Sequence, residues 1–279
     1  MTGELDRPVF IVSPPRSGSS LLFRTMMQAP DVFTIGGESH ALIESVPSLH
    51  PRERGWESNR LTAADATPGV VEALSVRFVA ALRDRDGRRP DGPARMIEKT
   101  PKNSLRVPFL AAAFPDAWFV YLHRDPRATL SSMMEAWASG RFRTYPRLPD
   151  WPRSDWSLLL TPGWREWRHL PLPEVAARQW STTSGILVAD LEALGPERVR
   201  ALSFEALVAD PQAAIAALCA SLGLAWDRAL ASPLPLSPSV VSAPRSGKWR
   251  RNEAAIERVW PIVAAEAGRA AGFAKAREV

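Results

Sequence analysis

FIVSPPRSGSSLLFR, residues 10–24, is the stretch that decides the fold. The apolar run 8–12 mixes β-branched and aromatic residues without a charge, which predicts a buried strand. A polar loop of small residues follows at 13–20, and apolar residues 21–23 open a helix. Such a junction aims backbone N–H groups and a positive helix end at one point, where a phosphate or sulfate group can bind. Because Arg16 adds a fixed positive charge, the stretch predicts an anion-binding loop.

The loop departs from the one that binds nucleoside triphosphates. That loop, G-x-x-x-x-G-K-[ST], uses lysine for the terminal phosphates and Ser/Thr for magnesium. Here Pro14 stands near the place of the first glycine, and Ser19 follows Gly18 where the lysine belongs. The loop is therefore suited to an anion but lacks the lysine of a triphosphate kinase. A serine-rich turn without a ligand is the alternative.

Composition narrows the class of protein. The chain has 279 residues, 46% of them hydrophobic, which is enough for one large α/β domain. Its net charge is +5, but the arginines are dispersed without basic runs, which favours a small anionic ligand over nucleic acid. The single cysteine, Cys219, excludes an internal disulfide and a cysteine zinc site. The sequence shows no secretory signal and no run of eighteen apolar residues, so we expect a cytoplasmic protein without a membrane span.

A second motif follows another apolar strand, predicted at 118–122. Arg124 stands where that strand ends, Asp125 suits a helix N-cap, and Pro126 suits the first helical position. Ser132 lies eight residues after Arg124, about two turns into the helix. A further strand, predicted at 95–98, leads to Lys99, and Ser104 can cap the helix that follows. Strand ends of this kind meet at the carboxyl edge of a parallel sheet, where ligands of open α/β folds bind.

Glu38 and His40 are the candidate proton acceptors. They follow two glycines in Gly36-Gly37-Glu38-Ser39-His40, and either side chain could take a proton from an attacking hydroxyl. As an alternative, Glu38 caps a helix that starts at Ser39 or pairs with an arginine. For His40 the alternative is a packing role.

Three later segments complete the pattern. Residues 139–173 carry four tryptophans and six prolines, which suggests either a lid or acceptor pocket or the packing of an irregular segment onto the domain. Phe204 follows a strand predicted at 199–203 and could equally be a core residue. Gly247, Lys248, Trp249 and Arg250 form part of a basic loop that can enclose a phosphate and a base, or is simply solvated.

In this order the elements resemble those of the sulfotransferases that use 3′-phosphoadenosine 5′-phosphosulfate (PAPS), over nearly the whole chain. The resemblance implies a three-layer α/β/α sandwich around a mainly parallel sheet, as a single domain over 1–279. It implies a 5′-phosphosulfate loop, a 3′-phosphate site at Arg124 and Ser132, an aromatic near the adenine at Phe204, and a closing loop at 247–250. The loop residues concerned are Pro15, Arg16, Ser17, Gly18, Ser19 and Ser20.

The catalytic roles rest on the same resemblance. Where many relatives have a catalytic histidine after Lys-Thr, this chain has Lys99-Thr100-Pro101, and Arg16 and Leu21 replace a lysine and an adenine-stacking tryptophan. Some relatives use a glutamate after the first helix, so Glu38 becomes the expected base, with His40 next. Arg16, with Lys99 or Lys102, would stabilise charge on the sulfuryl oxygens and the leaving phosphate.

The expected activity is transfer of the sulfuryl group from PAPS to an acceptor hydroxyl or amine, with 3′-phosphoadenosine 5′-phosphate (PAP) as product and no metal ion. We expect a small-molecule, carbohydrate-like or lipid-like acceptor, and no nucleic acid. The alternatives are a P-loop kinase or nucleotide hydrolase, and a non-catalytic nucleotide-binding protein. Oligomeric state is not predicted.

Overall fold

The computed structural model describes residues 4–153, 155–235 and 247–279. In this part of the chain, five parallel strands form one sheet in the order β2-β3-β1-β4-β7. The strands are β1 (Val9–Val12), β2 (Val32–Phe33), β3 (Arg95–Lys99), β4 (Trp118–His123) and β7 (Val199–Ser203). The chain continues from β1 to one side of the sheet and later to the other, so β1 lies at the crevice where ligands of such sheets bind.

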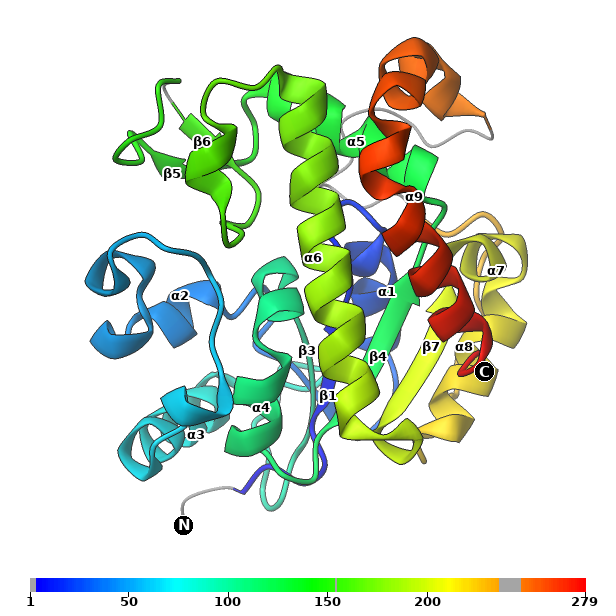
Figure 1. Cartoon of the computed structure of the whole chain (residues 1–279). Coiled ribbons are helices and arrows are strands. Elements are labelled where there is room, and N and C mark those ends of the chain that lie inside the picture. The colour runs from blue at the N-terminus through cyan, green and yellow to red at the C-terminus, as the bar shows by residue number, and fades with distance from the viewer. Residues whose placement is uncertain (1–3, 154, 236–246) are drawn as a thin grey trace.

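Helices connect the strands and cover the sheet (Figure 1). They are α1 (Ser19–Met26), α2 (His40–Glu44), α3 (Pro68–Ala81), α4 (Val107–Ala113), α5 (Pro126–Ser139), α6 (Leu172–Leu194), α7 (Phe204–Ala209), α8 (Pro211–Ser221) and α9 (Glu253–Lys275). Short 3-10 turns lie between them, among them Pro51–Arg54, Pro101–Leu105 and Lys248–Asn252. A small antiparallel pair, β5 (Arg143–Pro146) and β6 (Asp155–Ser157), lies apart from the main sheet.

Alternation along the strands explains the three layers. Successive side chains of a strand point to opposite faces of the sheet. Phe10 and Val12 therefore pack with α4, α6 and α9, whereas Val9 and Ile11 pack with α1 and α8. All four are buried, as expected of a parallel sheet covered on both faces. The predicted α/β/α sandwich with its parallel sheet is confirmed.

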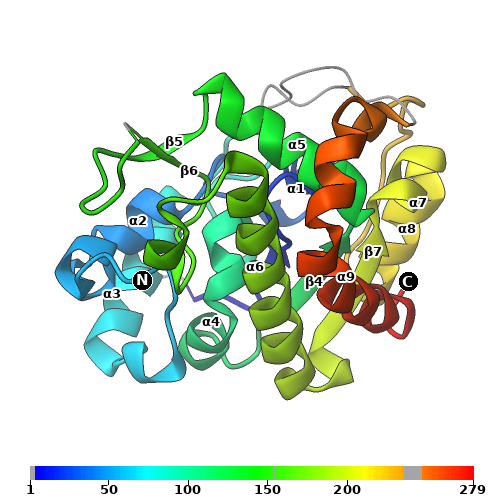
Figure 2. The same ribbon diagram turned by 45° about the horizontal axis from the view of Figure 1, so that its top comes forward.

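A second core lies beside the sheet, in the upper part of the molecule in Figures 1 and 2, where α5, α6 and the β5–β6 pair come together. All four tryptophans of residues 139–173 are buried in it, each less than 7% exposed: Trp151, Trp156, Trp164 and Trp167. The rings of Trp151, Trp156 and Trp164 contact one another edge to face, with the Trp151 and Trp156 centroids 4.8 Å apart, and the Trp167 ring stacks on Trp156. These four tryptophans therefore pack an irregular segment onto the domain, which was the second of the two interpretations of residues 139–173.

Two helix N-termini show where a capping residue in the sequence predicts the structure and where it does not. Asp125 is the N-cap of α5 and accepts a hydrogen bond from the Ala128 N–H at 2.7 Å, as predicted. Ser104 was expected to cap α4, and this is wrong: Arg106 occupies that position, and the Ser104 hydroxyl donates to the Ser13 carbonyl. A tertiary bond to the end of β1 replaces the local cap.

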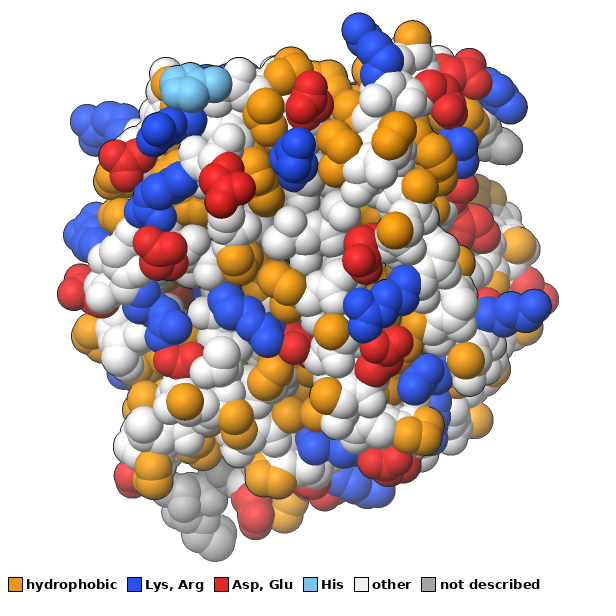
Figure 3. All heavy atoms as spheres, viewed as in Figure 1, with side chains coloured by type: hydrophobic (Ala, Val, Ile, Leu, Met, Phe, Trp, Pro, Cys, Tyr) orange, Lys and Arg blue, Asp and Glu red, His pale blue; other side chains and the backbone are white. Residues whose placement is uncertain are grey.

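The surface over α6 and α9 mixes both signs of charge. In Figure 3 basic and acidic side chains are interspersed over this face, with apolar side chains between them. Within the described ranges, no helix combines the length and the apolar character needed to cross a membrane.

Candidate functional site

A cavity of about 1100 Å³ opens at the carboxyl ends of β1, β3 and β4. The loop after β1 forms one wall, and α5, Phe204 and the turn at 247–249 continue it. The opposite end is lined by the chain around 38–56 and by residues of the β5–β6 region. The cavity is thus an elongated site with two chemically different ends, which we call the donor end and the acceptor end.

The anion-binding loop is held in an unusual backbone shape. Arg16 has φ 71°, in the left-handed region that non-glycine residues rarely adopt, and Gly18 has φ 97°. A Cβ atom at Gly18 would lie 2.3 Å from the Phe204 ring, so only glycine fits there. Helix α1 begins at Ser19, and its free N–H groups face the cavity that Ser19 and Ser20 line.

Two half-buried arginines meet at the donor end. The Arg124 Nη1 donates to the Arg16 carbonyl at 2.9 Å, and the Arg16 Nε donates to the Ser132 hydroxyl at 3.3 Å. Among the described residues neither guanidinium forms a salt bridge, and the buried Arg124 Nε has no hydrogen-bond partner. Burial and the adjacent Arg124 lower the pKa of Arg16 to about 10. The carboxylates of the described residues Glu135, Glu205 and Asp125 oppose part of this charge without a salt bridge to either guanidinium, and the remaining positive charge favours binding of a multiply charged anion.

The C-terminal turn closes the same end. Lys248 lines the cavity and pairs with Glu135 of α5 at 2.9 Å, and the Asn252 amide donates to the Ser131 hydroxyl at 2.9 Å. Arg250 is directed away from the cavity and pairs with Glu253 at 3.0 Å. Residues 244–246 of the predicted basic loop lie outside the described residues.

Glu38 lies between the two ends of the cavity. Its carboxylate accepts a hydrogen bond from the Lys99 Nζ at 2.6 Å and lies 3.6 Å from the His40 Nδ1. The same Lys99 ammonium donates to the Ser20 hydroxyl at 3.0 Å and so connects Glu38 to the first turn of α1. Burial alone would raise the pKa of Glu38, but His40 and Lys99 outweigh it and lower the pKa to about 2. Glu38 is therefore an ionised carboxylate facing the cavity at neutral pH.

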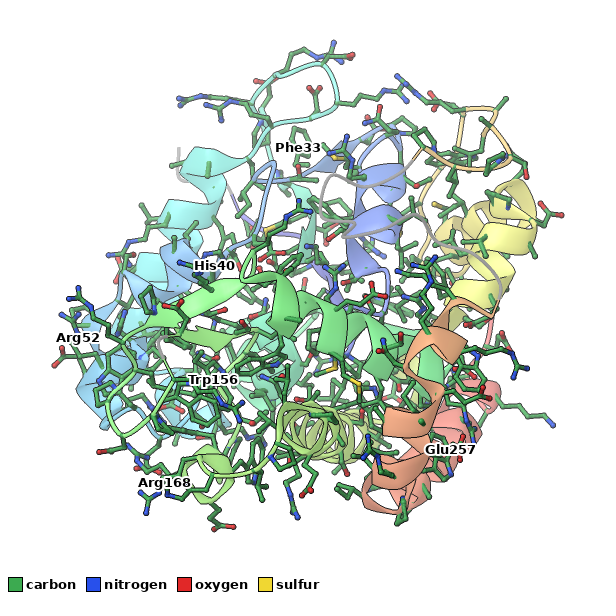
Figure 4. All side chains as sticks on the ribbon, turned by 90° about the horizontal axis from the view of Figure 1, so that it is seen from above. Phe33, His40, Arg52, Trp156, Arg168 and Glu257 are labelled. Carbon is green, nitrogen blue, oxygen red and sulfur yellow. The ribbon has the colours of Figure 1, made fainter. Side chains whose placement is uncertain are left out.

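The acceptor end contains residues that the sequence did not single out. His50, Arg52 and Trp56 line it, together with Phe142 and Tyr145. Figure 4 shows His40 and Arg52 on the same side of the molecule, and Trp156 further inside, under the β5–β6 region. The acceptor end therefore combines aromatic and aliphatic surface with a few basic side chains.

A buried ionic group supports this wall. Glu44 accepts from the Lys102 Nζ at 2.8 Å and from the Arg106 Nη2 at 2.6 Å, and the Lys102 ammonium lies 4.8 Å from the centre of the Tyr145 ring. Burial lowers the pKa of Lys102 to about 8. Because Glu44 pairs with two buried cations, Glu38, which pairs with Lys99 alone and lies 3.6 Å from His40, is the better candidate for a proton acceptor.

Most of the predicted site residues come together on the cavity wall: Pro15, Arg16, Gly18, Ser19, Ser20, Glu38, His40, Arg124, Ser132, Phe204, Gly247, Lys248 and Trp249. Ser17 is buried behind the loop, and Lys99 reaches the site only through Glu38 and Ser20. Phe204 contacts Gly18 and the Arg124 guanidinium, whose centre lies 4.5 Å from the ring. These contacts hold the anion-binding loop in place. They also occupy part of the Phe204 ring surface on which a nucleotide base would stack.

The chain matches a family model described as the sulfotransferase family over residues 8–228. It is 25% identical to protein-tyrosine sulfotransferase A of Caenorhabditis elegans over 78% of this chain and 50% of that protein. It is 32% identical to protein-tyrosine sulfotransferase 2 of Gallus gallus over 45% of this chain and 33% of that protein. The chain spans at most about half the length of these two relatives.

Among solved structures, a sulfotransferase from Alicyclobacillus acidocaldarius superposes with a TM-score of 0.57 at 20% identity. The match covers 97% of both chains. At this identity the likeness concerns the fold.

Proposed function

Because the chain belongs to the sulfotransferase family, we propose that it transfers a sulfuryl group from PAPS to an acceptor hydroxyl. The observation that carries the proposal is the Lys99 bridge, which joins a carboxylate on the cavity wall to the first turn of the anion-binding loop. The proposed base and the anion-binding loop are thereby held side by side. In-line transfer needs this arrangement, because the acceptor must lose its proton next to the donor group.

The donor end fits a nucleotide with two separate phosphate groups. The loop and the N-terminus of α1 suit the 5′-phosphosulfate, and Arg124, Ser132 and Lys248 suit the 3′-phosphate. The unpartnered buried Arg124 Nε supports this assignment, because it is a donor without an acceptor among the described residues. Trp249 and the side chains near Phe204 offer apolar surface for the base.

In the proposed reaction PAPS supplies the sulfuryl group. Glu38 takes the proton of the acceptor hydroxyl. At the same time the hydroxyl oxygen bonds to sulfur, and the bond from sulfur to the 5′-phosphate oxygen breaks. Arg16 and the loop N–H groups stabilise the negative charge that develops on the sulfuryl and phosphate oxygens. Lys99 holds Glu38 ionised and in place. His40, 3.6 Å from Glu38, is the second candidate for the proton.

The acceptor is a hydroxyl compound whose body fits between Trp56, Phe142 and Tyr145. The relatives named above as protein-tyrosine sulfotransferases make a tyrosyl peptide one acceptor to test, beside small phenols, sugars and lipid-like alcohols. Released PAP, which every acceptor yields, is the common readout for such a panel.

The first test is calorimetric binding of PAP without magnesium. We expect the wild type to bind PAP and Arg124→Ala to bind it roughly 10- to 100-fold more weakly, because hydrogen bonds to charged groups contribute about 1.5–3 kcal/mol. Arg88→Ala, an exposed arginine in the 83–93 loop, is the matched control and should bind like the wild type. Failure of the folded wild type to bind PAP would overturn the proposal, and ATP with magnesium would then test the kinase alternative.

The second test concerns the base. Glu38→Gln should lower kcat for sulfuryl transfer by roughly 10²- to 10⁴-fold and leave PAP binding nearly unchanged, because Glu38 lines the cavity outside the anion-binding loop and its proposed role is to take the proton of the acceptor. His40→Gln, measured in parallel, should retain more activity. A larger loss in the His40 variant would assign the proton to the imidazole instead.

A further inference from the structure

Glu98 is a buried carboxyl group that the proposed reaction does not use. It is the penultimate residue of β3 and is 1% exposed. Among the described residues it forms no salt bridge, and it accepts hydrogen bonds from the hydroxyls of Ser39 at 2.7 Å and Thr100 at 2.5 Å and from the Asn103 amide at 2.7 Å. A buried carboxyl group is unfavourable unless its oxygens are satisfied, so this network has a definite structural role.

The position of Glu98 follows from the strand register. Glu98 pairs with Phe10 and Lys99 with Ile11 in the parallel sheet, and these two partners pack on opposite faces. Lys99 therefore emerges on the α1 side and binds Glu38, whereas Glu98 emerges on the other side and binds Ser39. The consecutive strand residues Glu98 and Lys99 therefore bind Ser39 and Glu38, which are consecutive in the loop.

The position of the loop at residues 36–39 depends on these contacts with Glu98 and Lys99. On its N-terminal side, Gly36 and Gly37 have no atoms within 4 Å of the place where a side chain would begin, and the Gly36 N–H donates to the Thr34 hydroxyl at 3.0 Å. On its C-terminal side, the Ser39 N–H donates to the Thr100 hydroxyl at 2.7 Å, and the Thr100 hydroxyl donates to Glu98. Ser39 is also the N-cap of α2, so its position sets the direction in which Glu38 leaves the backbone.

The second carboxyl oxygen of Glu98 binds a different segment. It accepts from Asn103, which lies in the turn Pro101–Leu105 beside Lys102. Through one side chain, the loop that carries the proposed base is connected to the turn that carries the cation under the acceptor end. Both segments follow the carboxyl ends of strands, the loop after β2 and the turn after β3.

We propose that Glu98 is a positioning residue for sulfuryl transfer, which holds the Glu38 carboxylate in its reactive place through hydrogen bonds to Ser39, Thr100 and Asn103. The inference rests on the proposed function. Burial raises the pKa of Glu98 in spite of these bonds, which agrees with a role that needs acceptor atoms and no negative charge.

Two substitutions separate hydrogen bonding from charge and from bulk. Glu98→Gln keeps an acceptor for Ser39 and Thr100, and its amide can donate to the Asn103 Oδ1, a buried oxygen without a partner among the described residues, once the Asn103 amide turns over. Glu98→Met keeps a similar length but offers no such acceptor. We expect the Met variant to lose about tenfold or more in kcat with KM for PAPS and PAP affinity changed less than about twofold, and the Gln variant to keep most of kcat.

The opposite patterns overturn the inference. These are a Met variant with wild-type kcat, a Met variant whose PAP affinity falls as far as its kcat, or a Gln variant as slow as the Met variant. Should Glu98→Met show no cooperative thermal unfolding, Ser39→Ala carries the test: we expect a roughly 3- to 10-fold lower kcat at unchanged PAP affinity. Ser184→Ala, which removes a buried hydroxyl of α6, should leave kcat unchanged.

The same assays distinguish failure of the inference from failure of the proposed function. A wild-type protein that neither binds PAP nor releases it from PAPS would overturn both. An active wild type together with unaffected Glu98 and Ser39 variants would overturn the inference alone.

Discussion

Lys99 shows at the scale of one residue how the site controls its own charge. Its ammonium contacts Glu38 and Ser20 but does not line the cavity, so it acts on the carboxylate from behind. Such a cation stabilises the ionised form of its neighbour and lowers the neighbour's pKa. The proposed base is therefore kept ready without a direct contact between Lys99 and the acceptor.

Replacement of Lys99 by Met should change the pH dependence of catalysis. Burial, now opposed only by His40, raises the pKa of Glu38 from about 2 toward the ordinary range of a glutamate or above it. A general base works above its pKa, so activity of the variant should fall as the pH drops through that raised value, in a window where the wild type is unaffected. The measurement is kcat from pH 4 to 8, with Lys275→Met as control. Parallel profiles for variant and wild type would contradict the explanation.

Individual residues were predictable where spacing and local chemistry define them. The family resemblance assigns Arg124 and Ser132 to a 3′-phosphate site through their eight-residue separation at a strand–helix junction, and Glu38 is named as the acid next to a pair of glycines. All three line the cavity, and their roles stay predictions. The acceptor wall was not predictable, because residues 50–68 lack the periodicity that would predict a helix or a strand, and such a segment indicates a surface loop. Tertiary bonds hold that segment: the Asn59 N–H donates to the Leu160 carbonyl at 2.7 Å, and the Leu160 N–H donates to the Asn59 side chain at 2.6 Å.

At the scale of elements, the contact between the anion-binding loop and the start of α7 is the least tolerant. Gly18→Ala would place a methyl group 2.3 Å from the Phe204 ring at a φ of 97°, which L side chains rarely adopt. We expect a loss of roughly 2–4 kcal/mol in the free energy of unfolding and weaker PAP binding.

The control for Gly18→Ala is Gly69→Ala in α3, where nothing lies within 4 Å of the added atom and which should be neutral or slightly stabilising. Urea unfolding and calorimetry measure both effects. Addition of Phe204→Ala should restore part of the stability, because it removes the overlap but not the backbone strain. An unaltered Gly18→Ala protein would show that the loop is not braced by α7.

The elements themselves were largely predictable, and their ends less so. The runs predicted as strands at 8–12, 95–98, 118–122 and 199–203 correspond to β1, β3, β4 and β7, and the helices expected after the anion-binding loop and after Asp125 correspond to α1 and α5. Ser104 failed as a cap because its hydroxyl satisfies the end of β1, a partner 91 residues away in the chain. Local sequence contains no information about such a partner.

At the scale of the whole molecule, stability rests on two cores: the sheet with its helices, and the tryptophan cluster beside it. Trp156 is fully buried, contacts four other tryptophans and donates through its Nε1 to the Leu159 carbonyl at 3.0 Å. Leu158 and Leu159, which follow it, line the acceptor end. The cluster therefore supports the cavity wall from behind.

Trp156→Ala should destabilise the protein by about 3–5 kcal/mol, because it leaves a large cavity in a packed core. The acceptor end should be affected more than the donor end, so KM for the acceptor should rise more than the dissociation constant of PAP. Val76→Ala, at an exposed position of α3, is the control for stability. Urea unfolding and steady-state kinetics give the two readouts, and equal changes at both ends would contradict a local supporting role.

The architecture of the sheet was predictable because its strands are uniformly apolar and its ligand loops follow strand ends in a recurring order. The second core was not predictable in the same way. Tryptophans in a proline-rich segment are equally compatible with a lid and with packing, and only the three-dimensional neighbours decide. The role of residues 139–173 as a lid or acceptor-pocket insertion stays a prediction, to which Phe142 and Tyr145 on the cavity wall lend support.

The last two residues of β3 place a limit on how the chain can vary in length. Glu98 and Lys99 reach opposite faces of the sheet, so a one-residue insertion or deletion within 95–99 would exchange the carboxyl group and the ammonium between the two faces. The neighbouring 83–93 loop is free of this constraint, because its length does not set the strand register. Functional homologues are therefore expected to differ in length in that loop and to keep the same number of residues between the start of β3 and the lysine.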